Sequence, residues 1–166
     1  YFWDTISNRY GYYGKVGKDQ LSAQYSKASI FLDSQDRTDF ENEISGMNQN
    51  SPYNQLGETG SITPKAIAVN FLGNNKVQAN FKTTVIKGAE IRQYSYTVTA
   101  DYITDNFDDL NVKDRWINPF GVKFKNWNLT QNSSNDALVT QNPVTQPLPK
   151  PEASTASEPV AQTSNN

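Results

Sequence analysis

The chain has 166 residues, contains neither cysteine nor histidine, and carries a net charge of −2 with acidic and basic residues interspersed. The absence of these two residue types excludes a disulfide framework, a thiolate nucleophile, a histidine base and the commonest zinc ligands. The mixed charge provides no clustered basic face for nucleic acid, and no apolar run approaches the length of about 18 residues that a membrane-spanning helix needs.

Composition divides the chain near residue 131. Residues 1–131 contain all of the aromatic side chains, whereas residues 132–166 are rich in Asn, Gln, Ser, Thr and Pro. A segment of the second kind buries too little apolar surface to offset the entropy of ordering. We therefore predict one folded domain over residues 1–131 and a disordered tail over residues 132–166.

The first segment is aromatic and has a helical pattern. Apolar side chains recur every three or four positions, which predicts a helix over residues 2–12. Its aromatic residues are Tyr1, Phe2, Trp3, Tyr10, Tyr12 and Tyr13. One stripe of a helix cannot bury all of these side chains against a single sheet, so we expect some of them to meet a partner.

Two further helices are predicted before residue 47. The apolar positions of residues 18–28 keep a helical spacing. A third helix carries Phe40, with Ser34 or Asp36 as its candidate N-terminal cap and Gly46 as its stop signal.

From residue 48 onward the sequence changes to turn chemistry and then to an apolar period of two, which predicts strands. The predicted strands cover residues 65–72, 76–86, 91–103 and 121–129. In the first of them we expect Ile67, Val69 and Phe71 on the apolar face, and Gly73 begins a hairpin turn. Strands with one apolar and one polar face indicate an α+β fold, in which three helices cover one side of a four-stranded antiparallel sheet.

The most specific motif is the turn Asn118-Pro119-Phe120-Gly121. Pro119 fits the second position of a type I turn, and the side chain of Asn118 can bond to the turn backbone. Gly121 can adopt the positive φ that a bulge in the next strand requires. The turn would display Phe120 at its tip, although the spacing alone is more typical of a purely structural turn.

Several elements, taken in order, resemble the periplasmic domain of the VirB8 family of type IV secretion components. They are Arg9 with Tyr12 or Tyr13 in the opening helix, the turn at Asn50-Ser51-Pro52-Tyr53 with Gly57, the alternating strand from Lys76, and the segment from Arg115 to Val122. The similarity covers residues 1–132. One departure is Tyr10, which follows Arg9 where the family often has Glu.

The resemblance implies a nuclear-transport-factor-two-like fold and a bitopic inner-membrane protein whose periplasmic part is this domain. It implies a scaffold with no enzyme activity and no cofactor, which binds other secretion components and itself as a weak homodimer. We expect its membrane anchor to lie before Tyr1. The turn residues are implicated through the family and the others through their aromatic helix; together the candidate interaction residues are Asn118, Pro119, Phe120, Gly121, Phe2, Trp3, Arg9, Tyr10 and Tyr13.

Two other functions remain open. Folds of this class often enclose a pocket, and Tyr94, Tyr96 and Tyr102 could bind a ligand there or serve as core. Asp101 and Tyr102 cannot form an acid–base pair in one pocket, because neighbours in a strand face opposite sides. Without His or Cys an enzyme is disfavoured, and no catalytic or metal residues are predicted. A groove between helices and sheet could instead bind a peptide or small ligand without chemistry.

Overall fold

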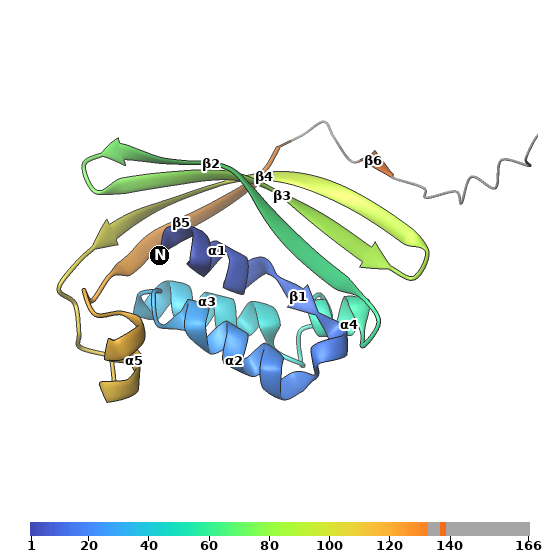
Figure 1. The fold of residues 1–166 in the computed structure, drawn as a ribbon, viewed down its shortest axis with the longest axis horizontal. Helices are drawn as coiled ribbons and strands as arrows, with labels where there is room; N and C mark the ends of the chain where they lie inside the picture. Colours follow the sequence, from blue (N-terminus) through green and yellow to red (C-terminus); the bar gives the residue numbers. More distant parts are fainter. Residues whose placement is uncertain (133–136, 139–166) are drawn as a thin grey trace, which may run out of the picture.

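The computed structural model describes residues 1–132 and 137–138. Helices come first and long strands afterwards, as the α+β interpretation predicts (Figure 1). The helices are α1 (Phe2–Tyr10), η1 (Gly14–Val16), α2 (Lys18–Ser29), α3 (Ser34–Ile44), α4 (Pro52–Leu56) and α5 (Val112–Ile117). The strands are β1 (Tyr12–Tyr13), β2 (Ser61–Gly73), β3 (Lys76–Lys87), β4 (Glu90–Ile103), β5 (Lys123–Gln131) and β6 (Ala137–Leu138).

The strands form one antiparallel sheet in the order β1-β2-β3-β4-β5, and β6 pairs with β4 beyond the end of β5. The sheet is strongly curved, and α1 lies directly beneath its concave side with α2 and α3 below (Figure 1). Along β3 and β4 the concave side includes a set of apolar, buried side chains, as the alternation predicts: Val77, Ala79, Phe81, Val98 and Ala100. The fold therefore has three layers, with α1 enclosed between the sheet and the outer helices.

The hairpin between β2 and β3 is fixed by its turn residues. Asn74 and Asn75 both have positive φ, 49° and 56°, which is the backbone of a type I′ turn. This turn matches the twist of the two strands that it joins, so the predicted hairpin is confirmed.

The expectation that Ile67, Val69 and Phe71 pack on the helices is wrong. All three side chains are exposed, and Phe71 retains 73% of its surface. The pairing with β3 shifts register between Ala66 and Ala68, which leaves Ile67 as the extra residue of a bulge. The distal half of the hairpin also extends past α1, α2 and α3, so these helices do not cover it (Figure 1).

The third helix is capped by Asp33, which neither of the two predicted caps anticipated. The Asp33 carboxylate accepts a hydrogen bond of 2.8 Å from the backbone N–H of Asp36. Ser34 is instead the first helical residue. The Asp36 side chain is thereby free to reach β5, where it accepts a hydrogen bond of 3.3 Å from the N–H of Trp127.

Two short α-helices, α4 and α5, were not predicted. In α4 the side chain of Ser51 accepts a hydrogen bond from the Asn54 N–H, and Pro52 occupies the first turn. In α5 the side chain of Asn111 accepts from the Asp114 N–H at 2.9 Å. Both helices are shorter than the apolar period that identifies a helix in sequence, so only their caps could have indicated them.

The predicted tail of residues 132–166 lies outside the described residues except at Asn132 and in β6. In β6, Ala137 pairs with Gln93 and Leu138 with Arg92 of β4. Disorder of the rest of the tail stays a prediction. Within the described part of the chain, no helix is long and apolar enough to cross a membrane.

Candidate protein-interaction site

The Asn118–Gly121 turn is held rigid by the buried, hydrogen-bonded side chain of its first residue. Asn118 is fully buried and donates from Nδ2 to the Val122 carbonyl at 2.8 Å, while its Oδ1 accepts from the Val122 N–H at 2.8 Å. The Gly121 N–H closes the turn on the Asn118 carbonyl at 3.2 Å. This is the predicted turn with Pro119 at its second position.

A neighbouring loop also stabilises the turn, through two backbone hydrogen bonds. The N–H of Asp105 donates to the Phe120 carbonyl at 2.9 Å, and the N–H of Asn106 donates to the Gly121 carbonyl at 3.0 Å. Gly121 has a φ of +55°, as predicted, and a Cβ there would lie 2.7 Å from the Asn106 nitrogen. Both its φ and its contact with the loop therefore require glycine.

The expected bulge at Gly121 is misplaced, because β5 begins two residues later. The irregularity in the β4–β5 pairing lies instead between the pairs Thr99–Asn128 and Asp101–Lys125. Asn126 there has a φ of 54° and bonds its side chain to Asp101 at 2.7 Å. Gly121 thus serves the turn and the loop rather than the strand.

Large apolar side chains gather around this turn on its solvent side. Trp116 is 85% exposed and Phe120 61% exposed, and Val112 and Ile117 of α5 are also exposed. A shallow hollow of about 460 Å³ is lined by Phe107, Val112, Arg115, Trp116 and Pro119. We call Val112, Trp116, Ile117 and Phe120 the α5 corner. Trp116, Val112 and Ile117 were missed as site residues because α5 itself was not predicted.

The opening helix meets the α5 corner through its preceding residue. The ring of Tyr1 stacks on Phe31 with centroids 5.4 Å apart and meets the edge of Phe120 at 6.3 Å. Two regions that the sequence marked separately, the aromatic start and the turn, therefore lie together at one end of the molecule. Tyr1 is the residue that joins them; it was counted among the aromatic residues of the first segment but not among the candidate interaction residues.

Several predicted interaction residues are buried within this chain, and their role as contact residues stays a prediction. Phe2 packs on Phe124 and Trp127, and the side chain of Arg9 is only 4% exposed. The reason is the three-layer arrangement, which covers α1 from two sides instead of one. Asn118 and Gly121 are likewise buried and act by positioning Phe120.

The Arg9 guanidinium belongs to a network inside the helical layer. It pairs with Glu43 at 3.2 Å, and its carbon lies 4.9 to 5.5 Å from the ring centroids of Tyr10, Phe40 and Trp127. Its Nε and Nη1 atoms have no hydrogen-bond partner within the described residues. The aromatic rings therefore supply the compensation for the buried cation, through cation–π attraction.

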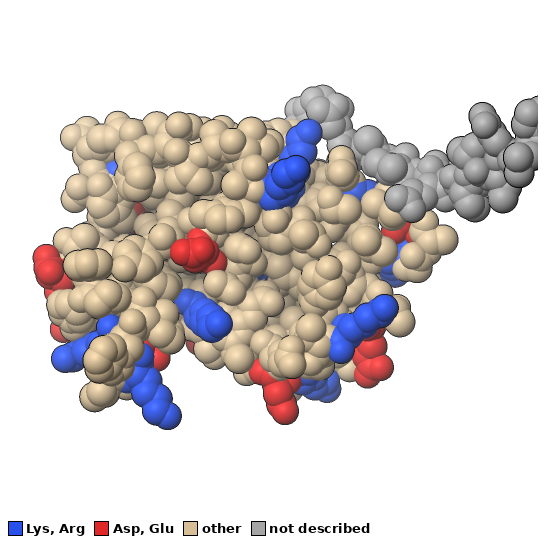
Figure 2. Space-filling view, in the orientation of Figure 1, with Lys and Arg blue, Asp and Glu red and all other residues tan. Residues whose placement is uncertain are grey.

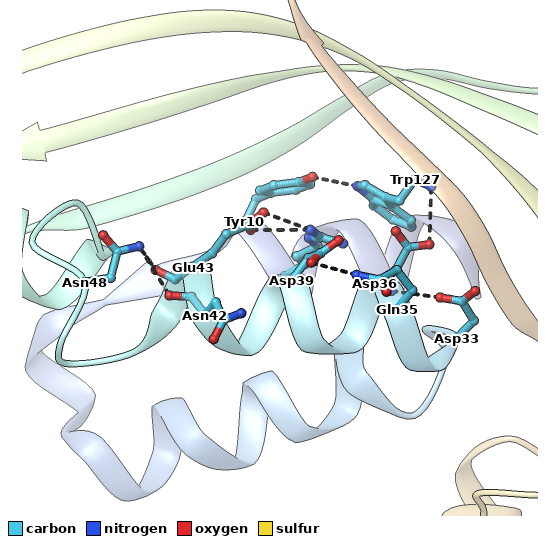
Figure 3. A network of polar contacts seen from close by, with 10 residues as sticks. Tyr10, Asp33, Gln35, Asp36, Asp39, Asn42, Glu43, Asn48 and Trp127 are labelled. Atoms are coloured by element: carbon cyan, nitrogen blue, oxygen red, sulfur yellow. Dashed lines mark hydrogen bonds and ion pairs between the residues drawn. The ribbon is translucent and has the colours of Figure 1, made fainter.

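Tyr10 and Trp127 connect α1 to β5 next to this cation. The Trp127 indole N–H donates to the Tyr10 hydroxyl at 2.7 Å, and burial raises the pKa of Tyr10 to about 12 (Figure 3). Burial also raises the pKa of Asp36 above its ordinary value of 3.8, against the lowering effect of its hydrogen bond from Trp127. Trp3, like Tyr10, is partly buried against the core. Trp3, Tyr10, Asp36 and Trp127 therefore stabilise the packing of the helices against the sheet.

Tyr13 is exposed but lies far from the α5 corner. It belongs to β1, pairs with Ser61 of β2, and sits at the opposite end of the molecule from α5 (Figure 1). Of the nine predicted interaction residues, the structure thus places only Pro119 and Phe120 at the exposed corner.

The concave face of the sheet offers little for chemistry. Tyr94 and Tyr96 line a hollow of about 140 Å³, whose other walls are Tyr10, Ile62, Phe81, Thr83, Val85 and Leu129. No carboxylate or amine lines it. Asp101 faces the other side of the sheet, where hydrogen bonds from Asn126 and Lys76 lower its pKa. The described residues also contain no cluster of acidic side chains that could hold a metal ion.

A larger hollow of about 560 Å³ lies among α2, α3 and α4. Its walls include Tyr12, Lys18, Tyr25, Glu41 and Tyr53. The Lys18 ammonium stands over the Tyr53 ring at 4.8 Å. This hollow lies within the helical layer, whereas the groove expected from sequence lay between helices and sheet.

This architecture also occurs in solved structures of known proteins. The chain is similar in fold to the VirB8 protein of Agrobacterium tumefaciens, with a TM-score of 0.71 and 22% identity over 81% of this chain and 90% of that one. It is also similar to the soluble domain of the type IV secretion protein TrwG from Bartonella grahamii, with a TM-score of 0.67 and 16% identity over 79% and 91%. A third match is TraE in complex with 2-(2-furyl)isonicotinic acid, with a TM-score of 0.64 and 12% identity over 79% and 92%.

Sequence comparison agrees with the fold. No curated protein matches the chain. The family model described as VirB8 protein matches residues 16–132, which is most of the described domain. The confirmed resemblance covers the long strands, the α5 corner and the turn. The chain therefore belongs to the VirB8 family of type IV secretion components.

Proposed function

We propose that this domain is the periplasmic part of a bitopic inner-membrane protein and that it acts as an assembly scaffold without catalysis. The α5 corner is the observation that carries the proposal. Exposure of Trp116 and Phe120 to water is unfavourable for the monomer. Contact with a partner would remove this apolar surface from water. The buried hydrogen bonds between Asn118 and Val122 keep these side chains preorganised, so little conformational entropy is lost on binding.

The partners that this proposal implies are other components of the secretion machine and a second copy of the domain. Aromatic side chains at the centre of an interface commonly supply most of its binding energy. A membrane anchor would confine the domains to one surface and raise their effective concentration, so a weak homodimer contact is sufficient. The enzyme alternative is disfavoured because neither a carboxylate nor an amine lines the tyrosine-lined hollow of the sheet.

Replacing both Trp116 and Phe120 by Ala in the full-length protein tests the proposal. We expect transfer of secreted substrate to fall by about tenfold or more, since losing two anchor side chains typically costs several kcal/mol of binding. The melting temperature should stay unchanged, because both side chains are exposed. Cross-linking to the other secretion components and sedimentation of the isolated domain report which contact is lost.

The matched control is Met47→Ala, which removes another highly exposed apolar side chain, 95% exposed, away from α5. It should leave transfer intact. Normal transfer and normal cross-linking by the Trp116→Ala/Phe120→Ala variant would contradict the proposal.

A second candidate function is non-catalytic ligand binding in the hollow of α2, α3 and α4. Its volume suits a small molecule, and Lys18 beside Tyr53 offers a cation to a carboxylate. TraE, a protein of similar fold, has been solved in complex with pyridine carboxylic acids. Impaired transfer after changes at Lys18, with the α5 corner intact, would favour this alternative.

A further inference from the structure

The open edge of β2 is a second surface, apart from the α5 corner. On this side β1 pairs only with Ser61 and Ile62. From Thr63 to Gly73 the backbone of β2 is paired with β3 alone within the described residues (Figure 1). In an antiparallel edge strand, alternate residues direct their N–H and C=O groups outward. Such a row of groups is a template for an additional strand.

The first half of this edge carries the features that normally prevent pairing. Pro64 has no N–H to offer, Lys65 is charged, and the bulge at Ile67 interrupts the ladder. The second half, Ala68 to Leu72, has neither proline nor a charged residue, and its pairing with β3 is regular from Ala68 to Phe71, with a second irregularity only at Leu72 beside the hairpin turn. Phe71 and Leu72 are 73% and 54% exposed there. Protection of one half and exposure of the other indicates that the distal half is available to a partner.

The charge of the hairpin specifies what kind of strand fits. Residues 61–88 contain four lysines and no acidic residue. Lys76 is bound to Asp101 at 2.9 Å, but Lys65 and Lys82 are direct cross-strand neighbours and both are exposed. Neither has an ion-pair partner in the described part of the chain. Like charges in such positions are destabilising until a counter-charge arrives.

Basic side chains lie together where β2 and β3 cross, and no acidic side chain is beside them on this face (Figure 2). Pairing of β2 with β2 of a second copy would bring two hairpins of the same positive charge together. A partner strand with carboxylates on one face would instead neutralise Lys65 and Lys82. The charge therefore favours a different, acidic segment over a second copy.

We propose that the distal edge of β2 binds an extended segment of another protein by strand addition, and that this segment alternates apolar with acidic residues. Its backbone would continue the sheet beside Ala68 to Leu72 and its apolar side chains would cover Val69 and Phe71. Its carboxylates would lie near Lys65 and Lys82. The type I′ turn holds the edge in the bound conformation, which lowers the entropic cost of binding.

This surface is independent of the α5 corner, so the two proposals can fail separately. The test uses the isotopically labelled chain and a synthetic peptide of about eight residues that alternates valine with glutamate. Addition of the peptide should shift the amide NMR signals of Ala68 to Leu72 and leave those of α5 in place. A valine–lysine peptide should bind at least about tenfold more weakly at low salt, because its charge repels the hairpin.

Two controls separate strand addition from general attraction. The same valine–glutamate peptide with alternate amides N-methylated keeps its charge but loses the backbone donors, and it should not bind. The variant Lys65→Glu/Lys82→Glu should reverse the preference in favour of the lysine peptide. Both changes are at exposed positions, so the fold should persist, and the amide spectrum of the core, which should be unchanged, is the check.

Three results would overturn this inference. The first is equal binding of the N-methylated peptide, and the second is shifts that are confined to residues outside β2 and β3. The third is dimerisation through β2, seen as concentration-dependent shifts of Ala68 to Leu72 without any peptide; that result would identify a second copy as the occupant. Loss of transfer in the Trp116→Ala/Phe120→Ala variant bears on the α5 corner alone.

Discussion

Asn118 is the residue on which the exposed corner depends, although it presents no surface itself. Its amide satisfies both the N–H and the C=O of Val122 in a fully buried position. A side chain with one donor and one acceptor at matched distances is required, and only Asn provides both at this length. The exposed Phe120 therefore depends for its position on a residue that no partner touches.

Removal of this amide should be costly. Asn118→Ala leaves two buried backbone groups of Val122 without partners, so we expect a loss of about 2–4 kcal/mol in the free energy of unfolding. Asn118→Asp keeps the acceptor but turns a second oxygen toward the Val122 carbonyl, so its loss should be larger at neutral pH than in acid, where the protonated acid can donate. Urea denaturation at two pH values measures both, with exposed Lys113→Ala as the control.

Equal stability of the Asn118→Ala variant and the unmodified protein would contradict a stabilising role for the hydrogen bonds between Asn118 and Val122. So would a pH-independent effect of Asn118→Asp, since the geometry makes the missing donor the main difference between the two side chains.

The α5 corner is built at the scale of elements, from one short helix, one turn and one loop that are held by backbone hydrogen bonds. Loop residues Asp105 and Asn106 both donate to the turn. Asp105 itself has a positive φ of 59°, so loop and turn are each in a conformation that isolated peptides rarely adopt. Each supports the other, and the element is stable only as an assembled unit.

Gly121→Ala tests this assembly, with Gly88→Ala as its control. Both glycines have positive φ, 55° and 61°, so each change should cost about 1 kcal/mol from the backbone. An added Cβ meets nothing within 4 Å at Gly88, whereas at Gly121 it would lie within 3.0 Å of three Asn106 backbone atoms. Gly121→Ala should therefore destabilise by about 2 kcal/mol more, as measured by thermal unfolding.

The larger substitution Gly121→Val should shift the amide signals of Asp105 and Asn106 as well as lower stability. Similar melting temperatures for the Gly88 and Gly121 variants would show that the loop yields to the added atoms, and the close approach would then be unimportant.

At the scale of the whole molecule, a polar network joins three elements that are distant in the chain. Asp36 of α3 bonds to Trp127 of β5, and Trp127 bonds to Tyr10 of α1 (Figure 3). The buried Arg9 lies against the rings of Tyr10 and Trp127. Global stability should therefore respond to the ionisation of Asp36.

The direction of that response follows from the raised pKa of Asp36, which burial causes. The folded state holds the proton more tightly than the unfolded state, so this group contributes stability below pH 3.8 that is lost as pH rises through the folded-state pKa. Asp36→Asn removes the contribution. We expect the unfolding free energy of the variant, relative to the unmodified protein, to increase as pH rises through this window.

Denaturant titrations of the two proteins across the acid range provide the measurement, and their difference cancels the other carboxylates. Asp39→Asn, on the exposed side of the same helix, is the control and should show little change. A difference between Asp36→Asn and the unmodified protein that moves in the opposite direction with pH would mean that Arg9 stabilises the carboxylate more than burial disfavours it.

The sequence by itself determined the features that depend on neighbours in the chain. The alternation of β3 and β4, the apolar period of the first three helices, and the Asn118–Gly121 turn were all predicted, because strand pleat, helical pitch and turn dihedrals are local properties. The resemblance that these elements carried led to the VirB8 family, which the comparisons confirm.

Only the tertiary structure decided which side chains are exposed. Phe2 and Arg9 are buried because α1 lies between two layers, and Phe71 is exposed because its hairpin extends past the helices; neither fact is encoded within a window of neighbouring residues. The α5 corner likewise required Tyr1, Trp116 and Phe120 to be brought together from opposite ends of the domain. Burial depends on packing between distant segments, so a sequence pattern could indicate apolar faces without showing which of them would be covered.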